Sequence, residues 1–322
     1  MRILSSVISK GTFSGCTNPV CVIPDGVTDI RPCAFDGYYT IETLLIPGSV
    51  RMLSQLSFGG CCPVKNINID ESNPYFSSDN GVLYDKNKSR LIYYPSGKED
   101  KEYYLPDSVI TVEKRAFFCN HSLAAIHVGK NNANYTSIDG VLFNKSADTL
   151  IQYCYGRNES SYTVPESVTR IEHAAFIYCD SLVKVLLPDA LTEIGACAFT
   201  GCSALVELSF PDNVQTFGHE AFMSCSSLRS IRLPKKMKSV GRRAFSCCEK
   251  LESVTIPQDL VSIEPEALAF CKSLAHIELP NSLQSIGFRA FAGCTSLSAI
   301  IIPDSVVNID DSVFEGCEVQ LL

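Results

Sequence analysis

Apolar positions in the C-terminal half of the chain follow a template that recurs at every twenty-third position. In the copy around Pro188, apolar residues stand six, three and one position before the proline and three and six positions after it. Gly195, an Ala-Phe pair and Cys202 complete the pattern, and the same offsets recur around Pro234. A fixed period of this size predicts a solenoid, in which each unit buries its apolar side only against its neighbours. The period is marked by seven prolines: Pro165, Pro188, Pro211, Pro234, Pro257, Pro280 and Pro303.

Each unit is predicted to contain one strand, one bend and one helical turn. Val185 and Leu187 alternate along the chain, so they lie on one face of a short strand, which ends at Pro188 because proline cannot donate to a β ladder. A second extended or turning segment follows, and Gly195 permits a backbone bend. The Ala-Phe pair and the cysteine after it fit a single helical turn that points all three inward. The pattern therefore predicts a repeat solenoid of leucine-rich-repeat type, mainly β, with a parallel sheet on one face and short helical turns.

The residues also carry a family resemblance. The run "LPDALTEIGACAFTGCSALVELSFPDNVQTFGHEAFMSC" resembles the BspA-like leucine-rich repeats, which occur in surface and secreted proteins of anaerobic bacteria and of some protists. The pattern is specific, since an apolar template of eight positions recurs in register. The resemblance implies a curved right-handed solenoid with a role in adhesion or protein binding, and it implies no catalytic residues.

The repeat predicts one elongated domain over residues 1–322. Copies of the pattern with small slips are present near the N-terminus, and two later intervals, from Pro47 to Pro106 and from Pro106 to Pro165, are longer than the others. The long intervals match each other without a gap. The chain therefore divides into N-terminal repeats (1–62), two 59-residue repeats that each contain a 36-residue insertion (63–164), and seven regular repeats (165–322).

Each insertion is predicted to form a β-hairpin. In the first, residues 81–84 and 91–94 are short apolar runs separated by a polar turn, and residues 140–143 and 150–153 repeat this arrangement in the second. Ten of the thirteen tyrosines lie between positions 75 and 162. Their rings either pack the hairpins onto the solenoid, or they form an aromatic surface for a partner or a glycan. The candidates for such a surface are Tyr93, Tyr94, Tyr103 and Tyr104.

Sixteen cysteines would suggest a disulfide framework in a short secreted chain. Their positions favour another interpretation, because seven of them occupy the same slot in successive units. Stacked side chains of one column point in parallel, and a disulfide needs them to converge. We therefore expect a ladder of buried thiols that serve as small apolar groups. Its members are Cys179, Cys202, Cys225, Cys248, Cys271, Cys294 and Cys317.

Charge and hydropathy exclude several classes of function. A net charge of −8 argues against nucleic acid, which needs a basic face. No apolar stretch approaches the length of a membrane span, roughly 18 residues, so we expect no membrane insertion. The chain as given shows no signal peptide and reads as cytoplasmic, whereas the family resemblance suggests the cell surface or secretion. Residues 3–4 look like the end of a strand and 318–322 like the start of another. Three alternatives remain for these uncapped ends: they are covered by residues with a double role, the chain is part of a longer one, or it self-associates end to end.

No motif for catalysis, phosphate binding or metal binding is present. The sequence contains no GxSxG, no P-loop, no HExxH and no CxxC. The five histidines are too dispersed along the repeats to share one metal ion. We therefore predict that the protein is not an enzyme, with no catalytic residue, no cofactor and no metal site.

Two sets of residues are candidates for binding a partner. The first is a run of basic residues in an acidic protein: Arg229, Arg232, Lys235, Lys236, Lys238, Arg242 and Arg243. The second consists of strand positions that alternate with the core and are free to vary: Lys184, Leu186, Glu207, Ser209, Ser230, Arg232, Ser253, Thr255, His276 and Glu278. The basic run is either a solvated stretch or a patch for an acidic partner segment, in which charge sets the rate and orientation of association.

The leading hypothesis is a non-enzymatic module that binds a protein partner, of unknown identity, through the face of the solenoid sheet. The alternative is a carbohydrate-binding adhesin of the cell surface that uses the tyrosines of the hairpin insertions. A hydrolase hidden in the insertions is disfavoured, because they contain no Ser/His/Asp or Cys/His set at a plausible spacing.

Overall fold

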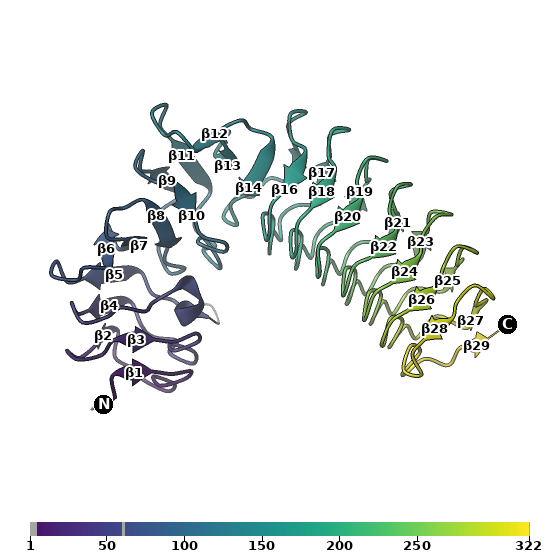
Figure 1. Ribbon diagram of the computed structural model, residues 1–322, viewed down its shortest axis with the longest axis horizontal. Coiled ribbons are helices and arrows are strands. Elements are labelled where there is room, and N and C mark those ends of the chain that lie inside the picture. Colours follow the sequence, from purple (N-terminus) through teal and green to yellow (C-terminus); the bar gives the residue numbers. More distant parts are fainter. Residues whose placement is uncertain (1–4, 60–61, 322) are drawn as a thin grey trace. The chain divides into compact units, whose positions relative to one another are not determined.

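The structure, a computed structural model, describes residues 5–59 and 62–321. Two compact units are present: unit 1 comprises Met1–Gly140 with Cys154–Gly156, and unit 2 comprises Val141–Tyr153 with Arg157–Leu322. Both are built from very short strands that stack on like strands of the next repeat (Figure 1). The domain boundaries expected from the sequence, at 62 and 164, remain a prediction. The strand end expected at residues 3–4 lies outside the described residues, as does Leu322.

The first row of strands in unit 2 contains one strand per repeat. The strands that pair are parallel and in register, so that Lys184 pairs with Glu207, and Ser230 with Ser253. This confirms the predicted parallel sheet and the leucine-rich-repeat fold class. The last strand of the row includes residues of the segment 318–322 that was expected to begin a strand. The strands are β15 (Ser161–Thr163), β17 (Lys184–Leu186), β19 (Glu207–Leu208), β21 (Ser230–Arg232), β23 (Ser253–Thr255), β25 (His276–Ile277), β27 (Ala299–Ile300) and β29 (Gln320–Leu321).

A second row of parallel strands covers the other side of each coil. Its strands follow the proline of each repeat. The sequence pattern predicted either an extended or a turning segment there. Glu193 pairs with Thr216 and Ser239 with Ser262, and the partners again stand one repeat apart. Unit 2 therefore has two rows of parallel strands, one on each side of the core, and each row is divided into shorter hydrogen-bonded sheets. The second row contains β16 (Arg170–Ile171), β18 (Glu193–Ile194), β20 (Thr216–Phe217), β22 (Ser239–Val240), β24 (Ser262–Ile263), β26 (Ser285–Ile286) and β28 (Asn308–Ile309).

The prediction of a helical turn in each unit is wrong for nearly every repeat. Across the described residues the one helix is the 3₁₀ turn η1 (Gln55–Phe58). Cys197 and Gly201 have positive φ angles of 55° and 74°, which interrupt a right-handed helix. The N–H groups of Cys197, Phe199 and Gly201 instead donate to carbonyl groups of the next coil, at 2.7 to 2.9 Å. An α-helix would direct these N–H groups along its own axis, whereas here they tie one coil to its neighbour.

A spine of phenylalanine rings runs through the core of unit 2, as the sequence predicts. The ring centroids of Phe176 and Phe199 are 4.7 Å apart, those of Phe199 and Phe222 are 5.3 Å apart, and those of Phe222 and Phe245 are 5.2 Å apart. The rings of each pair are nearly parallel, and all four residues are buried. Like residues therefore lie over like residues, which is the arrangement a solenoid needs.

The cysteine column is a ladder of reduced thiols, as predicted. The structure adds a role that the sequence does not reveal. The Sγ of Cys202 lies 3.0 Å from the backbone carbonyl oxygen of Phe176 in the preceding repeat, and Cys225, Cys248 and Cys271 repeat this contact at 3.2 to 3.3 Å. Each thiol therefore fills the core and also donates to a buried carbonyl group. Outside this column, Cys119 is disulfide-bonded.

Unit 1 has the same plan. Its first row pairs β2 with β4 and β4 with β5, and separately β9 with β11, all parallel. Its second row pairs β1 with β3 and β8 with β10, also parallel. These strands are β1 (Val7–Ile8), β2 (Val20–Val22), β3 (Asp29–Ile30), β4 (Thr43–Ile46), β5 (Asn66–Ile69), β8 (Arg90–Tyr93), β9 (Glu102–Leu105), β10 (Thr111–Val112) and β11 (Ala125–Val128).

The two predicted hairpins are present, one in each unit. In unit 1, β7 (Val82–Asp85) pairs antiparallel with β8, and in unit 2, β13 (Val141–Asn144) pairs antiparallel with β14 (Thr149–Gln152). A third strand, β6 (Phe76–Asp79), pairs with β7 and was not predicted; a further strand, β12 (Tyr135–Ile138), lies at the corresponding position of the second module. The last hairpin strands, β8 and β14, pair in parallel with β10 and β16, so each hairpin is continuous with the second row.

A buried asparagine fastens the turn that follows the first hairpin. The Asn120 side-chain amide donates to the backbone oxygens of Pro95 and Lys98 at 2.8 and 2.9 Å. Its Oδ1 accepts from the backbone N–H groups of Ser122 and Leu123 at 3.1 and 2.7 Å. One fully buried side chain therefore satisfies backbone groups of two successive coils.

Asn120→Ala should lower the free energy of unfolding by at least about 2 kcal/mol, because it leaves several buried backbone groups without a partner. Urea unfolding followed by circular dichroism measures the change. Asn131→Ala, at an exposed asparagine of the same unit, should stay within about 0.5 kcal/mol of the parent protein. Equal losses of stability in the two variants would contradict this role of Asn120.

Candidate binding surfaces

The basic run of unit 2 is largely paired with acidic residues of neighbouring coils. Nearly all partners stand one repeat away in the sequence. Lys238 is the exception, because its partner Asp259 is slightly nearer in the sequence. The ion pairs and charged hydrogen bonds are Arg229–Glu252 at 3.0 Å, Lys235–Asp212 at 2.5 Å, Lys236–Asn213 at 2.8 Å, Lys238–Asp259 at 3.1 Å, and Arg243 with Glu266 at 2.9 Å and Glu220 at 3.4 Å.

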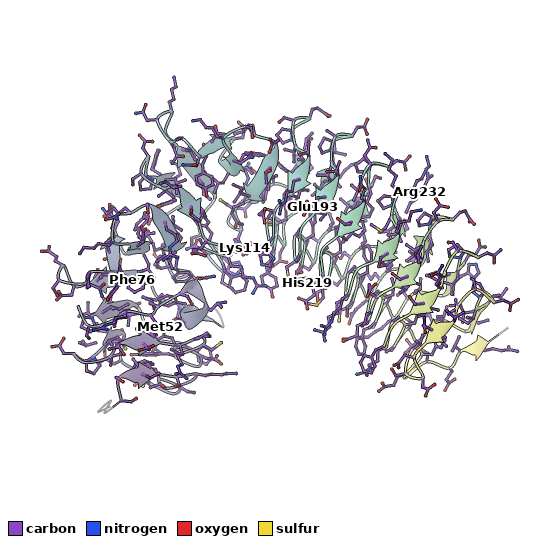
Figure 2. The ribbon with its side chains drawn as sticks, in the orientation of Figure 1. Met52, Phe76, Lys114, Glu193, His219 and Arg232 are labelled. Carbon is purple, nitrogen blue, oxygen red and sulfur yellow. The ribbon has the colours of Figure 1, made fainter. Side chains whose placement is uncertain are left out.

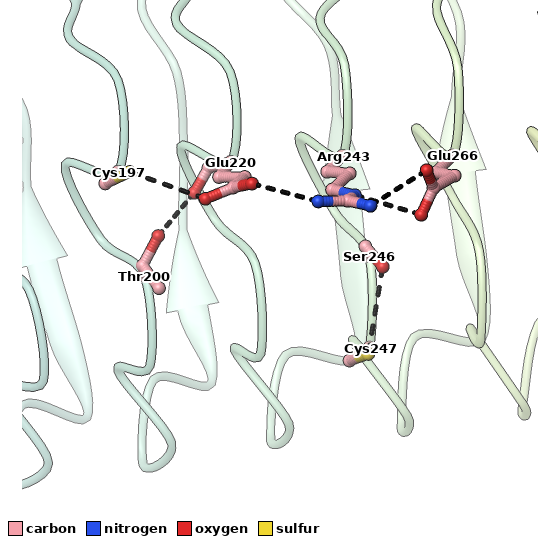
Figure 3. A network of polar contacts seen from close by, with 7 residues as sticks. All are labelled: Cys197, Thr200, Glu220, Arg243, Ser246, Cys247 and Glu266. Carbon is pink, nitrogen blue, oxygen red and sulfur yellow. Dashed lines mark hydrogen bonds and ion pairs between the residues drawn. The ribbon is translucent and has the colours of Figure 1, made fainter. Parts of the chain in front are cut away.

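Figure 3 shows the most extensive of these networks. The Arg243 guanidinium donates two hydrogen bonds to the Glu266 carboxylate and one to Glu220, and the Cys197 thiol lies 3.7 Å from the Glu220 carboxylate. The bonds from Arg243 hold the pKa of the Glu266 carboxyl below its ordinary value. The network joins four consecutive repeats. It therefore neutralises charge within the solenoid and does not leave Arg243 available to a partner.

Three members of the basic run differ from the rest. Within the described part of the chain, Arg232, Lys236 and Arg242 have no ion pair within 4.0 Å, and all three are exposed. Lys236 donates to the neutral side-chain amide of Asn213. Arg232 is the last residue of β21 and therefore lies in the first row of strands. Figure 2 labels it together with Glu193, which marks the second row. The basic patch predicted from the sequence is thus reduced to three cations without an ion pair, of which Arg232 is the one that lies in a strand of the first sheet.

The side of the first sheet that faces away from the core is exposed along unit 2. We call it the outer face. Its charged members Lys184 and Glu207 pair with each other at 2.8 Å, and His276 lies 3.5 Å from Glu278. Leu186 adds an exposed apolar side chain. The outer face comprises Lys184, Leu186, Glu207, Ser209, Ser230, Arg232, Ser253, Thr255, His276 and Glu278, all of which are exposed as predicted from their alternation with the core.

A shallow hollow of about 380 Å³ lies on the outer face, one repeat beyond Arg232. Thr255, His276 and Glu278 line it together with Gln258 and Asn281. The last two follow the repeat proline and were not among the predicted residues. Each of them stands directly after the proline of its repeat, and this fixed position in the repeat could have identified them from the sequence.

The aromatic surface expected in the hairpin insertions is wrong for Tyr93 and Tyr94, which are buried. Tyr93 stacks on Phe58 with ring centroids 4.4 Å apart, so it extends a separate column of stacked rings in unit 1 that also contains Phe13 and Phe35. Tyr94 packs against Phe117 at 5.6 Å. Tyrosine composition alone cannot distinguish a buried ring from an exposed one, because the ring is apolar and the hydroxyl is polar.

The other two tyrosines have different environments. Tyr103 is partly buried, and its hydroxyl makes a hydrogen bond with the Tyr84 hydroxyl at 2.5 Å. Burial raises the pKa of Tyr84 to about 12. Tyr104, by contrast, is 70% exposed and stacks on His127 with ring centroids 4.8 Å apart. Of the four predicted residues, Tyr104 is therefore the one whose ring is mainly at the surface.

The described residues hold no group of three or more His, Cys, Asp or Glu side chains arranged to bind a metal ion. They also include no helix with the length and apolarity that a bilayer crossing requires. The described surfaces include the outer face with its hollow and the exposed ring of Tyr104.

Parallel strands that pair in register with strands of the next repeat, around columns of stacked rings, define a leucine-rich-repeat solenoid. The chain belongs to the BspA-type leucine-rich-repeat family: the profile described as "BspA type Leucine rich repeat region (6 copies)" matches residues 6–103, 96–203, 149–275 and 198–320. Repeats of this family are typically non-enzymatic scaffolds and generally bind proteins, which indicates a binding or adhesion module.

Solved bacterial structures share the fold. A leucine-rich repeat protein from Eubacterium ventriosum is 22% identical, with a TM-score of 0.72 over 94% of this chain and 83% of that one. A leucine rich cell surface protein from Faecalibacterium prausnitzii is 23% identical, with a TM-score of 0.54 over 94% and 69%. The leucine-rich repeat protein of T. pallidum is 29% identical, with a TM-score of 0.50 over 57% and 86%. No curated protein matches the chain.

Proposed function

We propose that the chain is a non-enzymatic adhesion module that binds a protein partner through the outer face of unit 2. The observation that carries the proposal is the unpaired Arg232 beside the polar hollow of the same face. Cell-surface placement of a structurally similar protein supports a role in adhesion.

The outer face suits protein recognition because its side chains do not contribute to the core. The core contacts of β21 and β23 are made by the alternate residues Ile231 and Val254, which are buried. Residues of the outer face are therefore free to contact a partner without a change in the core. A regular parallel sheet also holds them at fixed positions, which limits the entropy lost on binding.

Charge indicates what the partner presents. Most cations of the basic run are neutralised by carboxylates of adjacent coils, so they attract an acidic partner weakly. Arg232 lacks such a neighbour within 4.0 Å in the part of the chain that is described, and it can form a bidentate pair with a carboxylate of the partner. The hollow next to it offers hydroxyl, amide and imidazole groups. The proposed partner segment is thus acidic and polar.

Selection of a displayed library of random peptides on the intact chain tests this proposal. We expect acidic peptides to be enriched, and Arg232→Gln to weaken the best of them by about ten-fold, a change of about 1.4 kcal/mol. Lys235→Gln is the matched control, since it removes the same charge from a residue that is paired with Asp212. It should change the affinity less than about two-fold. Failure to enrich any peptide, or an equal loss of affinity in the two variants, would contradict the proposal.

A further inference from the structure

Unit 1 contains a polar pocket of about 460 Å³ beside the exposed Tyr104. Its lining comes from strands β5, β6, β7 and β9 and from the turns beside them. Its walls include Asn66, Asn80, Asp79, Asp100 and Glu102 in addition to Tyr104. The volume is in the range of sites that bind small ligands. The pocket lies outside the outer face of unit 2.

The floor of the pocket is a rigid layer of tyrosines. The paired hydroxyls of Tyr84 and Tyr103 line it, and the Tyr103 ring meets the Tyr94 ring edge-on at 5.0 Å. The Tyr94 hydroxyl is buried with no hydrogen-bond partner among the described residues. It lies close to the Asp100 carboxylate, which adds to burial in raising its pKa. The Tyr94 ring therefore supports the floor from beneath and is not itself part of the lining.

Tyr104 forms an aromatic wall with a fixed orientation. One face of its ring is stacked on His127, and its hydroxyl donates to the Glu102 carboxylate at 3.2 Å. The same carboxylate lies 3.4 Å from Nε2 of His127. These contacts hold the ring upright and leave its other face open. An aromatic face carries a partial negative charge and attracts the weakly positive C–H groups of a ligand.

The charges around the pocket oppose an ionic ligand. Asp79 is paired with Lys88 at 2.7 Å and Asp100 with Lys98 at 3.0 Å, which leaves little net charge to attract a cation. An anion would meet the Glu102 carboxylate, which among the described residues has no lysine within 4.0 Å to neutralise it. The lining nevertheless contains many groups that accept or donate hydrogen bonds, because the amides of Asn66 and Asn80 adjoin the carboxylates. The lining therefore suits a neutral ligand that has several hydroxyl groups and one apolar face.

We propose that this pocket is a saccharide subsite that holds a neutral pyranose ring. The C–H face of the ring packs on the open face of Tyr104, and its hydroxyl groups donate to the carboxylates of Glu102 and Asp100, which are stronger acceptors than neutral oxygens. The two asparagine amides supply donors for the ring and hydroxyl oxygens. The inference concerns unit 1 and does not rest on the peptide site proposed on unit 2.

A glycan array followed by calorimetric titration of the best saccharide tests the subsite on the intact chain. We expect neutral saccharides to bind and Tyr104→Ala to weaken them by about ten-fold or more. Tyr39→Ala is the matched control, because Tyr39 is an equally exposed tyrosine of the same unit, at 73%; its affinity should stay within about two-fold of the parent protein. Glu102→Gln keeps the shape of the side chain and should also weaken binding, since an amide accepts hydroxyl groups less strongly than a carboxylate.

Three outcomes would overturn the inference. The first is an array without a reproducible saccharide signal. The second is binding that Tyr104→Ala and Tyr39→Ala reduce equally. The third is a preference for lysine-rich or arginine-rich peptides over every saccharide, which would assign the pocket to a basic protein segment. Circular dichroism and the urea midpoint of each variant establish that its fold is unchanged, so a loss of binding cannot be attributed to unfolding.

Discussion

Phe222→Ala should lower the free energy of unfolding by about 3 to 5 kcal/mol. The ring is fully buried, and its centroid lies within 5.3 Å of the rings of Phe199 and Phe245 in the adjacent repeats. Phe210 and Phe217 contact it edge-on at 5.2 and 5.1 Å. Removal of the ring therefore leaves a cavity that borders three coils at once, and the backbone hydrogen bonds between the coils prevent the cavity from collapsing.

The effect should extend along the solenoid. In a repeat protein, stability is approximately a sum of the intrinsic stability of each repeat and of the interfaces with its neighbours. Phe222 contributes to two such interfaces, so its loss weakens both. Urea unfolding followed by circular dichroism gives the size of the change, and hydrogen exchange shows whether protection falls in the adjacent repeats. Ser230→Ala, an exposed change on the outer face of the next coil, should alter stability by less than about 0.5 kcal/mol. Similar losses in the two variants would refute the shared spine.

Alkaline pH should unfold unit 2 through its thiol column. Burial raises the pKa of Cys202 and of Cys294 from an ordinary value of 9.0 to about 12. It also raises the pKa values of Cys225, Cys248 and Cys271. An acid whose pKa is higher in the folded state keeps its proton there while the unfolded chain loses it. Stability is therefore complete below pH 9 and falls as the pH rises from 9 towards 12.

The size of the effect follows from the number of thiols. Each buried thiol removes about 1.4 kcal/mol of stability per pH unit in this window, and a typical domain has only about 5 to 15 kcal/mol in total. Five such groups should bring unit 2 to its unfolding midpoint within about two pH units above 9. Denaturation curves at several pH values, recorded with reductant, measure the slope. Cys248→Ala should reduce it by the contribution of one thiol, and a stability that stays constant up to pH 11 would exclude this account.

The repeat, the phenylalanine spine, the thiol ladder and the two hairpins were all predictable, because each depends on apolar spacing that is uniform along the chain. The helical turn was not. Its failure depends on residues such as Cys197, Glu220 and Arg243, which adopt positive φ angles of 53° to 58° although they are not glycine. Hydrogen bonds to the next coil hold them in this conformation, and such bonds between coils leave no pattern in a single repeat.

The candidate sites were less predictable than the fold. The cations of the basic run look like one patch when the sequence is read along the chain, but most of their partners stand one repeat away, as with Arg229 and Glu252. A comparison of charges at a separation of one repeat would have shown that they are paired. Tyr93 and Tyr104 are the same type of residue, and they differ in whether the side chain points into the core or towards solvent. That direction depends on how the hairpin joins the second row of strands.

The spacing between coils has a further consequence for the evolution of this chain. Strand pairs and ion pairs link residues 23 positions apart, and the thiol contacts link residues 26 positions apart. Because the core residues recur in each repeat, duplication or loss of one whole repeat preserves the strand pairing and the stacked core, whereas ion pairs such as Arg229–Glu252 depend on residues that are not repeated. Natural variants of this molecule can become longer or shorter in increments of about 4.8 Å, the distance between neighbouring strands, and can extend their reach without inventing a new interior.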